Sequence, residues 1–324
     1  MNVPTHAIIA ITLNCNARCV MCDIWKNKMG NELPPEAYQK LYPSLQDINI
    51  TGGEPFLRRD FPQVVANIKQ ACPKARLVVN TNGFLWRKIR GDMEKVIRTD
   101  PNIAIRLSID GIGEAHNVIR GIPNGFSYIM KTLAGLREVG VKDLGISFTL
   151  LEQNMDELPR VQKLAEKERL QFSLTVATGS SIYFGKDKGG LRPANSKKRA
   201  RIMNDAALFH YQHNDLKELV RGWFVKRMID YFATGKRALL CDAGKGFFYM
   251  DSFGNVYTCH LKPWIMGNIL KTPLEEIVEN AKFAERVQAC HDCWMICTAK
   301  STMRRKIVQV AAETLREKAV YCLH

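Results

Sequence analysis

Hydrophobic positions along the first 180 residues form short apolar runs that alternate with longer amphipathic segments. The short runs are typical of buried strands, and the longer segments have the periodicity of helices. Helices are predicted over residues 61–71, 126–140 and 155–168. Strands are predicted over residues 7–13, 48–50, 76–80, 103–110, 144–150 and 171–177.

Six β-α repeats predict an α/β fold in which a parallel sheet curves into a partial (β/α)6 barrel similar to a TIM barrel. In such sheets the chemistry gathers at the C-terminal ends of the strands. The polar, glycine-rich and cysteine-rich segments of this chain follow the predicted strands. These segments are residues 14–22, 51–55, 81–83, 108–111, 151–154 and 178–181.

The pattern changes after the last predicted strand. Residues 186–237 carry 13 Lys and Arg against 5 Asp and Glu, and we expect this basic segment to recognise substrate. Its helical stretch at 219–232 places aromatic residues on one face, which indicates either core packing or a surface for a lipid-linked or phosphorylated substrate. Another basic helix is predicted over 299–320. The expected domains are a barrel (1–180), a basic helical insert (181–240) and a small C-terminal domain (241–324).

Composition narrows the functional classes. The 324 residues are 46% hydrophobic, which excludes intrinsic disorder and leaves ample material for a core. We see neither a signal peptide nor an apolar run of transmembrane length, so a cytoplasmic location is expected. Disulfides are rare there, and the ten cysteines therefore indicate metal or redox chemistry. The net charge of +15 favours an anionic partner, including peripheral contact with lipid headgroups.

Three cysteines lie in one short loop directly after the first predicted strand, with the spacing Cys15-x3-Cys19-x2-Cys22. Three thiolates can bind three irons of a [4Fe-4S] cluster and leave one iron open for another ligand. Zinc is the alternative, but a structural zinc site requires four ligands. This loop contains no fourth Cys or His.

The cysteine loop, followed by Gly52-Gly53-Glu54-Pro55 after the second strand, resembles the radical S-adenosylmethionine (SAM) superfamily. The resemblance implies that the amino and carboxylate groups of SAM bind the open iron. One electron from the cluster would then cleave SAM to methionine and a 5′-deoxyadenosyl radical, which takes a hydrogen atom from substrate. A flavodoxin- or ferredoxin-type electron donor is implied as well.

The same resemblance implies which residues bind SAM. The two glycines would let the backbone approach the amino group of SAM, and Glu54 would add an acceptor. Arg120 would pair with the SAM carboxylate. Asp110, His116 and Asn154 have the alternative of a turn or cap role. The implied SAM-binding residues are Met21, Gly52, Gly53, Glu54, Ser108, Asp110, Arg120 and Asn154.

A second group of cysteines follows the insert. Cys241 and Cys259 flank a predicted hairpin with its turn at Gly254, and a Gly-Asn-Ile segment and a C-x2-C-x3-C segment come next. This order resembles the SPASM/twitch extension of radical SAM enzymes, which holds auxiliary [4Fe-4S] clusters. The full seven-cysteine SPASM pattern is absent, so one auxiliary cluster is expected, with zinc as the alternative. The implied ligands are Cys241, Cys259, Cys290 and Cys293, with Cys297 as a replacement or a spare thiol; Cys322 is not expected to ligate.

His260, directly after Cys259, occupies the position of an acidic base in sulfatase-maturing relatives. An imidazole titrates near neutral pH, so His260 is the candidate catalytic base that removes a proton from the oxidised substrate. The alternatives are a hydrogen bond to a cluster thiolate and an exposed turn residue.

The sequence therefore predicts a radical SAM enzyme that oxidises a small or anionic substrate (phosphorylated, sugar or lipid-linked) with the help of the auxiliary cluster. A maturase of ribosomal peptides is the alternative, although only 14 residues precede Cys15 where such proteins often carry a leader-binding domain. RNA modification is less favoured, because no RNA-binding motif is evident. A non-catalytic scaffold would not need the Gly-Gly-Glu-Pro and Ser-Ile-Asp segments.

Overall fold

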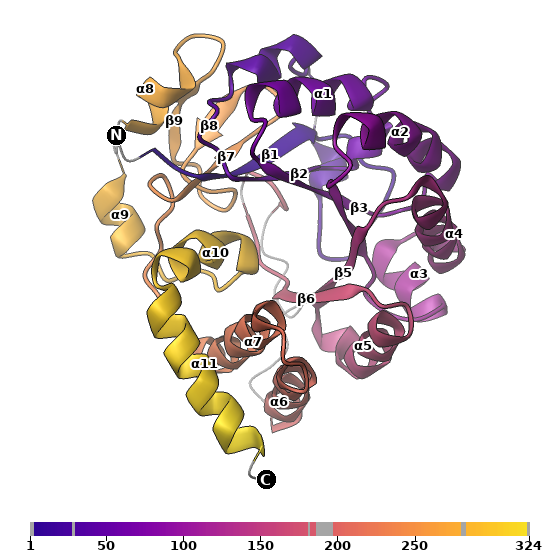
Figure 1. The fold of residues 1–324 in the computed structure, drawn as a ribbon, viewed down its shortest axis with the longest axis vertical. Helices are drawn as coiled ribbons and strands as arrows, with labels where there is room; N and C mark the ends of the chain where they lie inside the picture. Colours follow the sequence, from indigo (N-terminus) through magenta and orange to yellow (C-terminus); the bar gives the residue numbers. More distant parts are fainter. Residues whose placement is uncertain (1–2, 28–29, 181, 186–196, 280–282, 323–324) are drawn as a thin grey trace.

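The computed structural model describes residues 3–27, 30–180, 182–185, 197–279 and 283–322. Six strands curve around a central space, and helices pack on their outer side (Figure 1). Each strand pairs in parallel with the next one along the chain, which confirms the α/β partial barrel. The strands are β1 (His6–Thr12), β2 (Asp47–Gly52), β3 (Arg76–Thr81), β4 (Ala104–Ser108), β5 (Asp143–Leu150) and β6 (Gln171–Val176).

The helices that cover the outer face lie between these strands in the sequence. The predicted helix at 155–168 begins with a 3-10 segment that runs into an α-helix. The α-helices are α1 (Phe61–Ala71), α2 (Trp86–Thr99), α3 (Glu114–Arg120), α4 (Gly125–Val139) and α5 (Leu158–Lys167). The 3-10 segments are η1 (Ile24–Lys26), η2 (Pro35–Lys40), η3 (Pro55–Leu57) and η4 (Glu152–Glu157).

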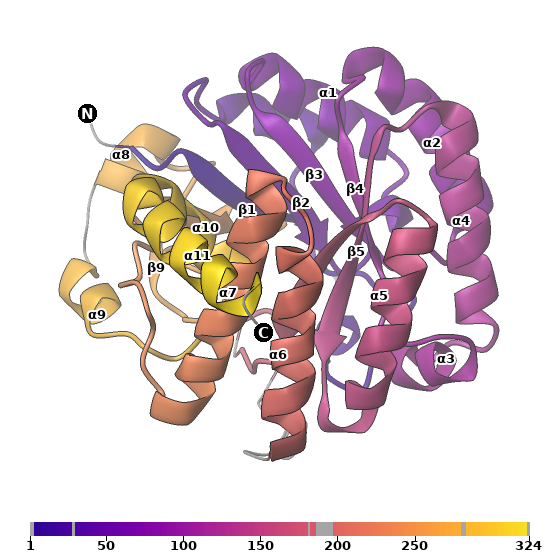
Figure 2. The same ribbon diagram turned by 60° about the horizontal axis from the view of Figure 1, so that its bottom comes forward.

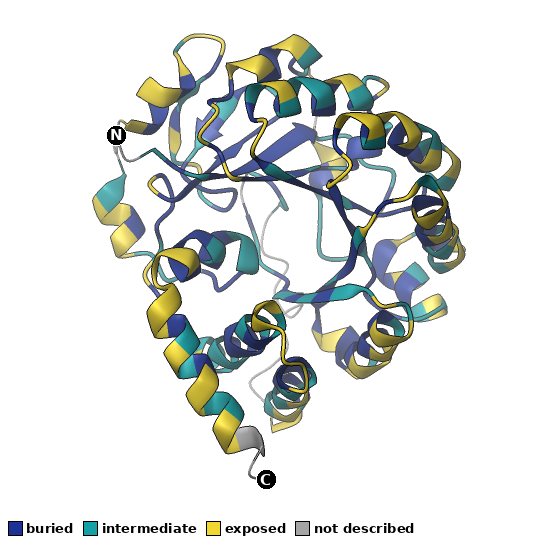
Figure 3. Cartoon of the chain, in the orientation of Figure 1, coloured by how far each residue is buried: buried dark blue, intermediate teal, exposed yellow. Residues whose placement is uncertain are grey.

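The two faces of each barrel strand differ in polarity. On β5, Ile146 and Phe148 belong to the hydrophobic core, whereas Ser147 and Thr149 line the interior of the barrel. Alternate residues of a strand point to opposite faces, so apolar residues pack under the helices and polar residues point inward. Figure 3 shows the corresponding burial of the strands and of the inner helix faces. The interior of the barrel therefore contains polar side chains, beside apolar ones such as Ile8 and Val78.

The C-terminal region extends the sheet of the barrel. Strand β7 (Phe247–Met250) pairs in parallel with β1, from His6 opposite Phe247 to Ile9 opposite Met250. Strands β8 (Asn255–Tyr257) and β9 (Ile265–Asn268) follow in antiparallel order and complete a nine-stranded sheet. Gly254 has a φ of 82° in the turn between β7 and β8, which confirms the predicted hairpin.

Helices of the insert and the C-terminus lie across the side left open between β6 and β1 (Figures 1 and 2). The prediction of one helix over 299–320 is wrong, because Lys306 leaves the helical conformation with φ −104° and ψ 28°. Met303 of the first of these two helices and Val310 of the second both belong to the core. The helices are α6 (Lys197–Tyr211), α7 (Leu216–Thr234), α8 (Leu274–Glu279), α9 (Ala284–Gln288), α10 (Ile296–Arg305) and α11 (Ile307–Cys322).

The aromatic face of α7 is part of the core. Trp223, Phe224 and Met228 are buried, so for these residues core packing is confirmed and a lipid-facing surface is wrong. Phe224 stacks on Trp294 with ring centroids 5.3 Å apart, and the Trp294 indole N–H donates to the Phe224 carbonyl at 3.0 Å. Trp294 thus joins α7 to the second cysteine group. None of the helices in the described part of the chain is long and apolar enough to cross a membrane.

We expect Trp294→Ala to destabilise the fold by about 3–5 kcal/mol, because it empties a large buried site and removes a hydrogen bond. Trp294→Phe keeps most of the ring packing and loses the N–H donor, so its cost should be about 1–2 kcal/mol. Anaerobic chemical denaturation of both variants measures the two values. Equal and small losses for both would show that Trp294 does not anchor α7.

Candidate functional site

A cavity of about 180 Å³ lies at the C-terminal ends of the barrel strands. All three cysteines of the first group line it, together with residues from the ends of β2 to β6 and from the segment after β6. The structure thus brings the cysteine loop and the strand ends to one place, as the sequence predicts. Five residues of the predicted SAM-binding set line this cavity: Met21, Gly52, Gly53, Ser108 and Arg120.

The thiols of this cavity have an environment that suits a bound iron–sulfur cluster. Burial raises the pKa of Cys15 to about 12 and that of Cys22 to about 11, so the free thiols are protonated. Metal ligation requires thiolates, and binding of iron would release these protons. The Arg120 guanidinium donates to the Cys19 sulfur at 3.6 Å, which supplies a positive charge beside an anionic cluster.

Gly52 and Gly53 pack against the backbone that leads into the cysteine loop. A Cβ on Gly52 would lie 2.1 Å from the Thr12 carbonyl oxygen, and one on Gly53 would lie 2.0 Å from that of Asn14. The Gly53 N–H also donates to the Thr12 oxygen at 2.8 Å. The glycines line the cavity as expected. The atoms that come closest to them are backbone atoms of the segment before the cysteine loop. A side chain here would displace the cysteine loop.

Glu54 does not face the cavity. Its carboxylate is fully buried and accepts hydrogen bonds from the Phe56 N–H at 3.2 Å, the Thr81 hydroxyl at 2.8 Å and the Asn82 N–H at 2.7 Å. The contacts that the structure gives Glu54 hold the ends of β2 and β3 together, and its role as an acceptor for SAM stays a prediction. Burial raises the pKa of this carboxyl to about 7.

Asp110 lies behind Arg120, away from the cavity wall. The two side chains form a buried ion pair at 2.7 Å, and Asp110 also accepts from the Thr149 N–H at 2.7 Å. Although burial opposes the charged form, Asp110 holds the pKa of Arg120 above its usual range. The structure thus links Asp110 to the cavity through Arg120, and a direct contact of Asp110 with SAM stays a prediction.

The side chains of Asn154 and His116 form hydrogen bonds to the backbone of Asp110. The Asn154 side chain accepts from the Leu151 N–H at 2.7 Å and donates to the Asp110 carbonyl at 3.0 Å. The His116 ring accepts from the Asp110 N–H at 3.3 Å, and burial lowers its pKa to about 3. The turn or cap role is what the structure shows for both residues, and neither of them lines the cavity.

Tyr183 and Phe184 line the cavity and were missed by the sequence analysis. The Tyr183 hydroxyl donates to the Gly52 carbonyl at 2.7 Å and lies 2.8 Å from the Thr51 hydroxyl. The Phe184 carbonyl accepts from the Asp23 N–H at 2.7 Å. The segment after β6 is therefore fixed to both the glycine segment and the cysteine loop. Its sequence shows no periodicity that could have indicated these contacts.

The second cysteine group gathers beside the first. Cys241, Cys259, Cys293 and Cys297 belong to one cluster of side chains that also contacts Cys15 and Cys22. Met295, in the same segment, lines the first cavity. Burial raises the pKa of Cys259 and of Cys297 to about 12. The Arg237 guanidinium donates to the Cys293 sulfur at 3.4 Å, an arrangement that favours a thiolate.

Among the described residues, no three His, Cys, Asp or Glu side chains are placed to hold a single metal ion. Ligation of a [4Fe-4S] cluster does not require such convergence, because each thiolate binds a different iron. Cys290, the first residue of the C-x2-C-x3-C segment, is half-buried. The side chain of Cys322 lies outside the described residues.

His260 is buried among aromatic rings. Its Nε2 lies 3.8 Å from the Cys297 sulfur, and the rings of Tyr183 and Phe184 meet it edge to face at 5.9 and 5.8 Å. Burial lowers its pKa to about 4, so the ring is neutral. His260 does not line the cavity, whose wall is formed here by the two aromatic residues. Its role as a base stays a prediction, and the contact that the structure gives it is with Cys297.

The Asp110–Arg120 pair gives the first prediction for this site. Asp110→Ala or Arg120→Ala alone should cost about 3–5 kcal/mol of folding stability, because each leaves a buried charge unpaired. The double variant should cost far less than the sum. Denaturation of all four proteins yields the coupling energy.

The matched control is the exposed pair of Arg90 and Glu138, whose nitrogen and oxygen are 3.2 Å apart. Its coupling should be below about 1 kcal/mol. If the losses at Asp110 and Arg120 simply add, their coupling energy would be as small as that of the surface pair. That result would contradict a buried ion pair.

Glu54 gives a pH-dependent prediction. Its folded pKa of about 7 lies above the ordinary value of 4.5, so its stabilising contribution is complete below pH 4.5 and is lost as the pH rises through 7. The loss should be about 3 kcal/mol, since one pKa unit corresponds to about 1.4 kcal/mol. The difference in unfolding free energy between the unsubstituted protein and Glu54→Gln, followed from pH 5 to pH 8, measures it. A difference that is constant over this range would show that Glu54 has an ordinary pKa.

Comparisons with known proteins agree with this architecture. The family model of the radical SAM superfamily matches residues 9–165, and that of SPASM, an iron–sulfur cluster-binding domain, matches residues 241–294. The native structure of anSMEcpe with bound AdoMet superimposes with a TM-score of 0.65 at 16% identity, over 96% of this chain and 99% of that one. This likeness confirms the fold.

The relatives match different shares of this chain and of their own length. Fe-coproporphyrin III synthase of Methanosarcina barkeri is 31% identical over a match that covers 49% of this chain and 40% of that protein. AdoMet-dependent heme synthase of the same organism is 24% identical over 89% of this chain and 85% of its own length. Sporulation killing factor maturation protein SkfB of Bacillus subtilis is 23% identical over 90% of this chain and 68% of its own length. The chain thus belongs to the radical SAM superfamily and carries a SPASM domain, and its cofactors are SAM, a [4Fe-4S] cluster and an auxiliary iron–sulfur cluster.

Proposed function

We propose that this protein cleaves SAM reductively at the first cysteine group and removes a hydrogen atom from a small or anionic substrate. The observation that carries this proposal is that Cys15, Cys19 and Cys22 share one cavity with Gly53, directly after β2, and with Arg120, at the end of α3. When bound, the [4Fe-4S] cluster supplies the electron that cleaves SAM to methionine and a 5′-deoxyadenosyl radical.

The side chains of the cavity have complementary tasks in this proposal. The three thiolates hold three irons and leave the fourth for SAM. Arg120 orients the SAM carboxylate: its guanidinium reaches the cavity, and its Nε is buried without a hydrogen-bond partner among the described residues. Met21 and Phe184 supply apolar walls, which exclude water from a reactive species.

The second cysteine group supports an oxidative outcome, in which the auxiliary cluster takes an electron from the substrate. We propose Cys241, Cys259, Cys290 and Cys293 as its ligands, with Cys297 as a replacement or a spare thiol. The hydrogen bond from Arg237 to Cys293 and the position of Met295 in the wall of the first cavity support this assignment. His260 is placed to hydrogen-bond Cys297.

Maturation of a peptide is the second candidate function. It is favoured by the similarity to SkfB, a maturation protein whose sequence matches 90% of this chain. A small-molecule substrate is favoured by the similarity to the heme synthase over 89% of the chain.

The test is anaerobic reconstitution followed by reduction with dithionite in the presence of SAM. The unsubstituted chain should hold about eight irons, as two [4Fe-4S] clusters require, and should form 5′-deoxyadenosine. The triple variant Cys15→Ala, Cys19→Ala, Cys22→Ala should retain about four irons and form none, because SAM loses its iron.

Cys72→Ala is the matched control. Cys72 is fully buried in the hydrophobic core, and its thiol donates to the Tyr42 carbonyl at 3.2 Å. It does not line the cavity of the first cysteine group. This variant should keep the full iron content and the formation of 5′-deoxyadenosine. If the triple variant also keeps both, the first cysteine group is not the site of SAM cleavage.

A further inference from the structure

A second, larger cavity lies inside the barrel at the opposite ends of the strands. Its volume is about 660 Å³, and its walls come from the starts of β1 to β4, from the inner faces of β5 and β6, and from α7 and α10. Asn80 lines both this cavity and the one that holds the first cysteine group. Cys297 also lines it. The larger cavity therefore borders the first one at Asn80 and reaches the second cysteine group at Cys297.

The walls of this cavity carry an excess of positive charge. Four carboxylates lie in or directly beside it: Asp47, Asp143, Asp215 and Glu218. They face six cationic side chains, which are Arg76, Arg106, Lys217, Arg221, Lys300 and Arg304.

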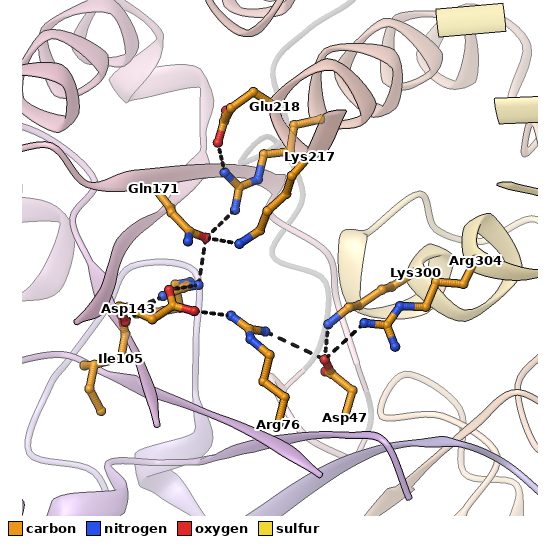
Figure 4. A network of polar contacts seen from close by, with 11 residues as sticks. Asp47, Arg76, Ile105, Asp143, Gln171, Lys217, Glu218, Lys300 and Arg304 are labelled. Carbon is orange, nitrogen blue, oxygen red and sulfur yellow. Dashed lines mark hydrogen bonds and ion pairs between the residues drawn. The ribbon is translucent and has the colours of Figure 1, made fainter. Parts of the chain in front are cut away.

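The imbalance is sharpest around Gln171, where three cationic groups share one neutral oxygen. The Gln171 side-chain oxygen accepts from Arg106 at 2.9 Å, from Lys217 at 2.7 Å and from Arg221 at 2.8 Å (Figure 4). An amide oxygen has two lone pairs and no net charge, so it cannot neutralise three cations. Arg106 and Arg221 have carboxylate partners in Asp143 and Glu218.

Lys217 differs from its two neighbours. Its ammonium has no carboxylate partner among the described residues, and Gln171 is the hydrogen-bond acceptor that the structure gives it. Burial and the nearby Arg221 lower the pKa of Lys217 to about 8. Burial likewise lowers the pKa of Arg106, despite its ion pair with Asp143. Desolvation is the main cause of both shifts, and the positive charge of Arg221 adds to each of them.

We propose that Arg106, Lys217 and Arg221 form an anion site that holds a carboxylate or phosphate group of the substrate, with its reacting part toward the first cysteine group. The identification of the ligand as substrate rests on the proposed function, whereas the anion site itself does not.

The strand geometry sets the length of such a substrate. From Arg76 to Asn80, β3 rises by about 13 Å, because a strand advances by about 3.3 Å per residue. Arg106 lies opposite Asn80 in the sheet, but its guanidinium contacts Asp143, as does that of Arg76. A substrate whose anionic group lies beside Asp143 must therefore extend along the barrel to reach the first cavity. The side chains along this path include the polar groups of Asn49 and Asn80, which are hydrogen-bonded to each other, and of Ser147. Ile8 and Val78 line the same cavity.

The test uses the reconstituted full chain and two probe anions at constant ionic strength. Tricarballylate represents carboxylates and lacks the hydroxyl through which citrate extracts iron; inorganic phosphate represents phosphates. Calorimetry should show saturable binding of one anion per chain for at least one of the two, and the arm that binds identifies the chemistry. Binding of neither anion, or binding that follows ionic strength alone, would overturn the site.

Two substitutions locate the binding. Lys217→Gln should weaken it by at least about tenfold, because one hydrogen bond to a charged group is lost and no buried carboxylate is left unpaired. Lys95→Gln is the control: like Lys217, Lys95 is exposed, but it lies on α2 and does not line the cavity, so binding should be unchanged. Equal affinity of the Lys217 and Lys95 variants would overturn the proposal.

Gln171→Glu supplies a second readout that needs no ligand. A fixed carboxylate should neutralise the three cations, raise the melting temperature of the anion-free protein and abolish anion binding. A lower melting temperature, or undiminished anion binding, would show that the cations are already satisfied. SAM cleavage by the unsubstituted chain is measured separately: cleavage without anion binding overturns this inference alone, and anion binding without cleavage overturns the proposed function alone.

Discussion

The pairing of β1 with β7 is the constraint on which the rest of the molecule depends. β1 leads directly into the first cysteine loop, and β7 leads through its hairpin to Cys259. Because β1 lies between β2 and β7 in the sheet, segments more than 200 residues apart in the sequence are held side by side. The glycine segment at the end of β2 and the second cysteine group therefore both border the loop that carries Cys15 and Cys22.

At the strand ends, some residues line the cavity and others support the residues that do. Residues that the family resemblance implies as ligand contacts fall into two sets. Met21, Ser108 and Arg120 line the cavity, whereas Glu54 and Asp110 lie behind it and hold the backbone or the Arg120 side chain in place. A cavity that must position a charged ligand needs such buried partners, since an unsupported guanidinium would not keep one orientation.

The strands of the barrel could be predicted from the sequence, but the contacts between distant segments could not. The six strands and the helix over 61–71 could be predicted because their hydrophobic pattern is local. The pairing of β7 with β1 could not, since a parallel pairing between distant segments leaves no local pattern. For the same reason Tyr183, in an irregular segment, gave no signal. The helix over 299–320 was predicted as one piece because its periodicity continues through Lys306, where the backbone turns. The cations around Gln171 come from β4 and α7, and their meeting is visible only in the folded chain.

The central claim is that two distinct cysteine groups hold two [4Fe-4S] clusters and that SAM binds to the first. The most direct measurement is electron paramagnetic resonance of the reduced, reconstituted protein with and without SAM. Two cluster signals are expected, of which one shifts on addition of SAM and disappears in the Cys15→Ala, Cys19→Ala, Cys22→Ala variant. A single signal, or two signals that SAM leaves unchanged, would contradict the account.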